Sequence, residues 1–225
     1  MTPIATFHSP LTSKFGIPRQ SGLVEGLVGE VVFVQEYRNP DYVRGLEGFD
    51  YIWLLWDFSA NSHKAHSATV RPPLLGGNRS MGVFATRSPY RPNPIGLSSV
   101  RIVRIDFDDA RGPVIKVSGA DLMDGTPIFD IKPYVEYADS HVGVRSGFVD
   151  EREWKCLEVA FAEGVGEWLS DDDREVVTQL LSLDPRPQFH DDPQRVYGMP
   201  FRNLDIRFRV ENKKLLVVEI TKLSK

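Results

Sequence analysis

Short apolar segments, separated by glycine, proline and asparagine, dominate the first half of the chain. Five of them are rich in Val, Ile and aromatic residues and are typical of β-strands: 30–37, 49–58, 81–86, 96–107 and 113–117. Several short strands at this spacing favour an antiparallel barrel, closed or nearly closed. The alternation within 96–107 slips once, which either a β-bulge or a misassigned segment would explain.

A helix and a hairpin are expected after about residue 140. Ser170 precedes three aspartates. The Ser side chain can cap free amides at a helix start, and acidic residues in the first turn suit the positive end of the helix dipole. Apolar residues then recur at helical spacing, which predicts an amphipathic helix over 171–183, and Pro185 prevents its continuation. Alternation over 206–210 and 215–220, on either side of a polar turn, predicts a terminal β-hairpin.

Length and composition support two folded parts. The chain has 225 residues, of which 41% are hydrophobic, enough to build a core in one main domain and a smaller one. We therefore predict a mainly β protein with a smaller α+β part. An antiparallel β-barrel domain would span 1–142, and a small C-terminal domain that contacts nucleic acid would span 143–225.

The charges are unevenly distributed. The chain carries a net charge of −4, yet residues 58–105 contain no Asp or Glu and seven basic residues. Such a segment favours binding of a polyanion, or arginines that pair with acids elsewhere in the fold. The seven are Lys64, Arg71, Arg79, Arg87, Arg91, Arg101 and Arg104.

Several common chemistries are excluded or disfavoured. Cys156 is the single cysteine, so neither an intrachain disulfide nor a thiolate zinc site is possible. The glycine-rich fingerprints of P-loop and Rossmann proteins are missing. His63 and His66 are three residues apart, but further ligands are not apparent, so no metal site is predicted. The apolar runs are far shorter than a membrane span, so we expect a cytoplasmic protein without membrane association.

Residues 85–98 form the most distinctive segment. Pro89, Pro92 and Pro94 fix φ and bias the residues before them to extended geometry, so this loop is stiff without helix or sheet. Arg87 and Arg91 on it offer guanidinium forks for carboxylate or phosphate. We interpret the loop as a ligand-holding element rather than a mere connection.

Three motifs together resemble the TsaA-like family, whose bacterial type is TrmO. They are Pro-Arg-Gln at 18–20, Thr-Arg-Ser-Pro-Tyr-Arg-Pro-Asn-Pro-Ile-Gly-Leu at 86–97 and Asp-Gly-Thr-Pro at 124–127. Residues 184–187 and 195–199 also match the longer bacterial members, so the resemblance spans nearly the whole chain. It implies a homodimeric, S-adenosylmethionine-dependent methyltransferase with a non-Rossmann barrel. The implied acceptor is N6 of threonylcarbamoyladenosine at position 37 of tRNA.

The resemblance also implies which residues bind the cofactor, S-adenosylmethionine. Arg19 or Arg87 would hold its carboxylate, and Asp124 or main-chain carbonyls would hold its ammonium group. The full set of implied cofactor residues is Pro18, Arg19, Gln20, Ser59, Ala60, Arg87, Leu97, Asp124, Gly125, Thr126 and Pro127.

The acceptor raises a chemical problem, because its urea-like N6 must lose a proton. Asp124, Tyr90 or Tyr197 is a candidate proton acceptor, and the sequence does not choose among them. The carboxylate of the modified base suits a bidentate contact with Arg91 or Arg186. Tyr197 and Phe189 are candidate stacking partners for a splayed base. The full set of candidate tRNA-binding residues is Arg71, Arg79, Arg91, Asn93, Arg186, Arg195 and Tyr197.

Two other functions remain open at this point: a regulator that binds S-adenosylmethionine without transferring the methyl group, and a plain RNA-binding barrel. The Pro-Arg-Gln and Asp-Gly-Thr-Pro motifs favour cofactor binding over the plain barrel.

Overall fold

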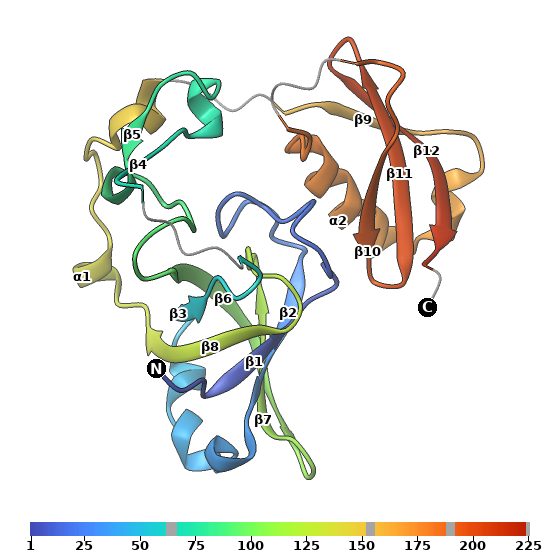
Figure 1. Cartoon of the computed structure of the whole chain (residues 1–225). Helices are drawn as coiled ribbons and strands as arrows, with labels where there is room; N and C mark the ends of the chain where they lie inside the picture. The colour runs from blue at the N-terminus through green and yellow to red at the C-terminus, as the bar shows by residue number, and fades with distance from the viewer. Residues whose placement is uncertain (62–66, 152–155, 188–191, 224–225) are drawn as a thin grey trace.

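The computed structural model describes residues 1–61, 67–151, 156–187 and 192–223. A barrel formed by the first part of the chain and a smaller sheet domain formed by the last part lie side by side (Figure 1). His63, Lys64, His66 and Phe189, which the sequence analysis singled out, lie outside the described residues.

Six antiparallel strands close the barrel in the order β1-β2-β7-β6-β3-β8. Their bounds are Ala5–His8 (β1), Val28–Phe33 (β2), Tyr51–Asp57 (β3), Ile95–Asp108 (β6), Gly112–Ser118 (β7) and Thr126–Pro133 (β8). Alternate residues of β3, namely Ile52, Leu54 and Trp56, point into the core. The register of β6 against β7 shifts between Ile102 and Arg104, so the predicted slip is a β-bulge. The predicted antiparallel barrel is confirmed.

Two predicted strands differ from the structure. Within 81–86, Met81–Gly82 forms a strand (β5), and it pairs with Thr69–Val70 (β4) outside the barrel. Val83–Ala85 is a 3-10 helix (η5) instead of a strand. Val83 is its buried residue, and the Thr86 hydroxyl donates a hydrogen bond to the Val83 carbonyl, which stabilises the turn. The strand expected over 30–37 ends at Phe33, and Gln35–Tyr37 turns into another 3-10 helix (η1).

Short helical turns make up the connections. The 3-10 turns are Pro40–Val43 (η2), Leu46–Gly48 (η3), Pro73–Leu75 (η4), Gly147–Glu151 (η6) and Val165–Trp168 (η7), and Glu136–Asp139 is a single α-helical turn (α1). In Figure 1, α1, β4 and β5 lie to one side of the barrel. None of the helices that the structure describes has the length and apolar character needed to cross a membrane.

The C-terminal domain is a four-stranded sheet with one packed helix. The strand order is β10-β11-β12-β9, with β9 parallel to β12. The bounds are Glu158–Phe161 (β9), Tyr197–Phe201 (β10), Leu204–Glu211 (β11), Lys214–Lys222 (β12) and Asp171–Ser182 (α2). Ser170 caps α2 by accepting a hydrogen bond from the Asp173 amide. The predicted helix and terminal hairpin are confirmed.

The connection between β1 and β2 contributes to the core of the C-terminal domain. Leu11, Val24 and Leu27 lie between β1 and β2, yet they pack in the apolar core of the C-terminal domain. A Cβ atom at Gly16 would lie 2.5 Å from the sulfur of Met199, which shows how closely this segment crosses the sheet. The segment that carries the Pro-Arg-Gln motif is therefore held by both parts of the protein.

Candidate functional site

A cavity of about 490 Å³ opens at one end of the barrel, where the three motifs meet. Residues from four segments line it: 14–20, the end of β3 with 57–61, the proline-rich loop with the start of β6, and the loop before β8. Of the eleven implied cofactor residues, eight line the cavity: Pro18, Arg19, Gln20, Ser59, Ala60, Arg87, Leu97 and Thr126. Segments far apart in sequence thus converge on one small-molecule-sized pocket.

Aromatic rings form one wall of the cavity. Trp56 and Phe58 pack with their ring centroids 4.3 Å apart. Gly96 lies opposite Trp56 in the β3–β6 register, and a Cβ atom at this position would come within 2.1 Å of the indole ring. Glycine is required here because the Trp56 ring lies directly against the backbone of β6.

A hydrogen-bonded chain links this wall to a carboxylate. The Trp56 indole N–H donates to the Ser98 hydroxyl at 3.0 Å, and Ser98 donates to Oδ1 of Asp121 at 2.5 Å. Burial raises the pKa of Asp121, and hydrogen bonds from Ser98 and backbone amides, together with the Arg87 charge, partly oppose that rise. The sequence analysis did not single out these three residues. The sequence signal that could have identified Asp121 is its position three residues before Asp124, the first residue of the Asp-Gly-Thr-Pro motif.

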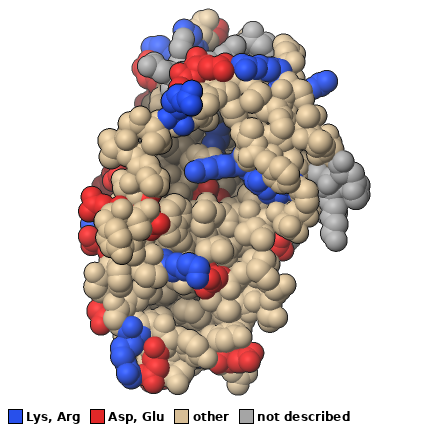
Figure 2. Space-filling view, turned by 90° about the vertical axis from the view of Figure 1, so that its left-hand side faces the viewer, with Lys and Arg blue, Asp and Glu red and all other residues tan. Residues whose placement is uncertain are grey.

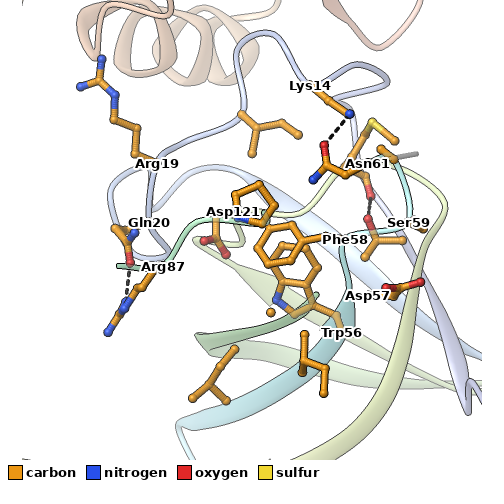
Figure 3. A pocket seen from close by; sticks show the side chains of 18 of the residues that line it. Lys14, Arg19, Gln20, Trp56, Asp57, Phe58, Ser59, Asn61, Arg87 and Asp121 are labelled. Carbon is orange, nitrogen blue, oxygen red and sulfur yellow. Dashed lines mark hydrogen bonds between the residues drawn. The ribbon is translucent and has the colours of Figure 1, made fainter. Parts of the chain in front are cut away.

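Cationic groups also line the pocket. Arg87 donates to the Gln20 side chain, so two of the motifs are joined directly (Figure 3). Lys14 donates to the Asn61 side chain at 2.6 Å. The Arg19 side chain extends away from these groups in Figure 3 and donates to the Asp184 carbonyl at 3.0 Å, in the C-terminal domain. Burial lowers the pKa of Arg19, and the Asp184 charge partly offsets this effect.

The proline-rich loop brings a further arginine to the cavity. Arg91 lines it and donates to the Thr86 carbonyl at 3.2 Å, which uses one of its five N–H groups. Basic side chains gather around a hollow in the upper half of the face shown in Figure 2, while acidic groups lie mostly toward its edges. The pocket and its surroundings therefore suit anionic groups.

The three residues predicted as proton acceptors do not line the cavity. Asp124 accepts from the Ser9 amide and contacts the His8 ring, each at 3.1 Å, and so fixes the turn before β8. Tyr90 is exposed on the proline-rich loop. Tyr197 is 7% exposed and stacks with Phe15 and Phe208 in the C-terminal core, and its role as a proton acceptor stays a prediction.

The candidate tRNA-binding residues differ in exposure and in their contacts. Arg71 and Asn93 are exposed, whereas Arg79 pairs with Glu151 at 2.7 Å. Arg186 makes two contacts with the Asp184 carboxylate and keeps 14% of its side chain exposed. Arg195 lies over the Tyr197 ring at 5.3 Å. Two further implied cofactor residues do not line the cavity: Gly125 lies in the turn before β8, and Pro127 lies in β8 itself.

Comparison with known proteins decides the family. Residues 6–140 match the model of the tRNA-methyltransferase O N-terminal domain, and residues 155–223 match that of the TrmO C-terminal domain. The chain belongs to the TrmO family. This membership confirms the predicted family and the predicted enzyme class, a tRNA methyltransferase.

Relatives of the TrmO family support this over nearly the full length. The tRNA (adenine(37)-N6)-methyltransferase of Escherichia coli is 35% identical and covers 92% of this chain and 91% of the relative. A putative S-adenosylmethionine-dependent methyltransferase of Pseudomonas aeruginosa, RcsF, is 37% identical, and the match covers 97% of this chain and 95% of the relative. The crystal structure of TrmO from P. aeruginosa superposes with a TM-score of 0.79 at 29% identity, and the match covers 98% of this chain and 96% of that structure's chain.

Proposed function

We propose that this protein transfers the methyl group of S-adenosylmethionine to N6 of threonylcarbamoyladenosine at position 37 of tRNA, and that it acts as a homodimer. The enzyme class, a tRNA N6-methyltransferase acting at position 37, follows from its family and full-length relatives. The cofactor, the threonylcarbamoyl group and the dimer are the finer parts of the proposal.

The observation that carries the proposal is the meeting of the three motifs around one cavity. Its residues fit S-adenosylmethionine. The Trp56–Phe58 wall suits the adenine ring, and the Arg87 guanidinium, already aligned by Gln20, suits the carboxylate. When bound, this cofactor supplies an activated methyl group. Asp57 places negative charge in the cavity lining, which suits the ammonium and sulfonium charges.

The acceptor base brings its own carboxylate, and Arg91 is positioned to read it. Its guanidinium keeps donors beyond the one that Thr86 receives, and a bidentate contact would distinguish the modified base from plain adenosine. Arg186 is already engaged with Asp184 on both carboxylate oxygens, so we favour Arg91. Holding the two substrates in line supplies much of the acceleration that such a transfer needs.

Methyl transfer from labelled S-adenosylmethionine into tRNA tests this function, with the label located by digestion to nucleosides. We expect the label at N6 of nucleoside 37. In Arg87→Ala we expect cofactor binding to be 10- to 100-fold weaker, because the variant loses one charge-assisted contact worth about 1.5–3 kcal/mol. Cofactor binding without transfer to tRNA would instead indicate a regulator. Sedimentation of the protein tests the homodimer.

A further inference from the structure

We propose that Asp121 is the catalytic residue that accepts the proton lost by N6 of the acceptor base during methyl transfer. This inference rests on the proposed function, and it assigns the proton acceptor that the motifs alone left open. Asp121 lines the cavity, is partly exposed to it, and lies between the Gln20–Arg87 pair and the Trp56 ring in Figure 3.

The hydrogen-bond chain behind Asp121 has a fixed direction. An indole N–H can only donate, so the Ser98 oxygen must accept from Trp56 at 3.0 Å. The single hydroxyl hydrogen of Ser98 is then directed to Oδ1 of Asp121 at 2.5 Å. Ser98 is 1% exposed and Trp56 is 6% exposed, so bulk water does not compete for these groups. Asp121 is therefore held in one orientation as an acceptor.

The surroundings of Asp121 favour a base that is ionised but readily protonated. Burial raises the pKa of this carboxyl, which makes it a stronger base than an exposed carboxylate. Four features favour the charged form: the Ser98 hydroxyl, the backbone amides of Asp121 itself and of Ser21, and the Arg87 guanidinium. The other charged groups that line the cavity are Lys14, Arg19, Asp57 and Arg91.

The carboxylate retains capacity for the incoming proton. Its two oxygens offer about four acceptor positions, and Ser98 with the backbone amides of Ser21 and Asp121 supplies three of the donors. In the reaction the N6–H bond breaks and the proton passes to Asp121. The nitrogen lone pair forms the new N–C bond, and the electrons of the S–CH3 bond remain on sulfur as a neutral thioether.

Asp121→Asn tests this role because asparagine keeps the shape and an acceptor oxygen for Ser98. Under single-turnover conditions with modified tRNA, we expect methyl transfer at least 100-fold slower, with the cofactor Kd measured by calorimetry within threefold. Asp130→Asn is the matched control, since Asp130 is a barrel carboxylate outside the cavity lining that pairs with Lys132. It should match the wild type.

A second variant tests the role even if Asp121→Asn folds poorly. Ser98→Ala removes the donor to Asp121, so the pKa of that carboxyl should rise further, as followed by carbon NMR of the carboxyl group in the unliganded protein. The acidic limb of the rate–pH profile should move to higher pH by the same amount. A carboxyl signal or a profile that stays in place would overturn the proposal.

The outcomes separate this inference from the proposed function. No transfer by the wild type would refute the proposed function. Transfer by the wild type and by Asp121→Asn within fivefold would refute only the role of Asp121. A loss that follows weaker cofactor binding would make Asp121 a cofactor anchor instead. If the rate–pH profile loses its acidic limb in Asp57→Asn but keeps it in Asp121→Asn, the proton acceptor is Asp57, the other carboxylate of the lining.

Discussion

Adding one methyl group at Gly96 should damage both the barrel and the cofactor pocket. The new Cβ would lie 2.1 Å from Cε2 and 2.4 Å from Cδ2 of Trp56, whereas ordinary contact begins near 3.4 Å. Trp56 must therefore move by roughly 1 Å or more in a close-packed core. Such overpacking costs about 1–3 kcal/mol, and loss of the Trp56–Ser98 hydrogen bond adds about 1 kcal/mol.

We thus expect Gly96→Ala to lower the free energy of unfolding by about 2–4 kcal/mol. Urea denaturation measures this, and calorimetry should show cofactor binding at least tenfold weaker because the aromatic wall has moved. Gly82→Ala is the matched control, since Gly82 has φ −56° and open space around its Cβ position. Gly96→Ala with wild-type stability and cofactor affinity would refute the packing argument.

Three further predictions concern single contacts. Ser170→Ala removes the cap of α2 and should lower the free energy of unfolding by about 1 kcal/mol, while the rate of methyl transfer stays unchanged. Lys213→Gly should raise that free energy by about 0.5–1 kcal/mol in urea denaturation, because Asn212 and Lys213 both have positive φ and Asn-Gly suits such a turn. Arg91→Ala should lower kcat/KM for modified tRNA about 10- to 100-fold with an unchanged cofactor Kd. An equal loss of kcat/KM and of cofactor affinity would contradict the proposed role of Arg91. Arg101→Ala is the control for cofactor binding, since Arg101 lies outside the cavity lining.

Local signals in the sequence were sufficient for much of the fold. The cap at Ser170 and the apolar spacing after it predicted α2, and clean alternation predicted the β11–β12 hairpin. The slip within β6 correctly marked a bulge. Each of these features depends on neighbours within a few residues, which is why the sequence displays them.

The unpredicted strands depend on distant partners. β1 has four residues, and polar residues interrupt the alternation of β8, so neither has a strong local signature. The two pair with each other to close the barrel across more than 100 residues of chain. The packing of Leu11 and Leu27 in the C-terminal core is likewise set by tertiary contact rather than by local pattern.

The site divides in the same way. The resemblance to a known family identified eight residues that the structure places around one cavity. Asp121 was not predicted because it lies in a loop and is linked only by tertiary contact to Ser98 of β6 and, through Ser98, to Trp56 of β3. Tyr197 stacks with Phe15, which lies 182 positions earlier, and a contact over that separation has no local signature in the sequence.

The most direct test of the account is methyl transfer from S-adenosylmethionine to two forms of one tRNA, with and without the threonylcarbamoyl group on adenosine 37. Nucleoside mass analysis would locate the added methyl group. We predict methylation at N6 of the modified nucleoside and little or no methylation of the unmodified transcript. Equal methylation of both forms would contradict the proposed reading of the threonylcarbamoyl carboxylate, and methylation of neither would contradict the proposed reaction itself.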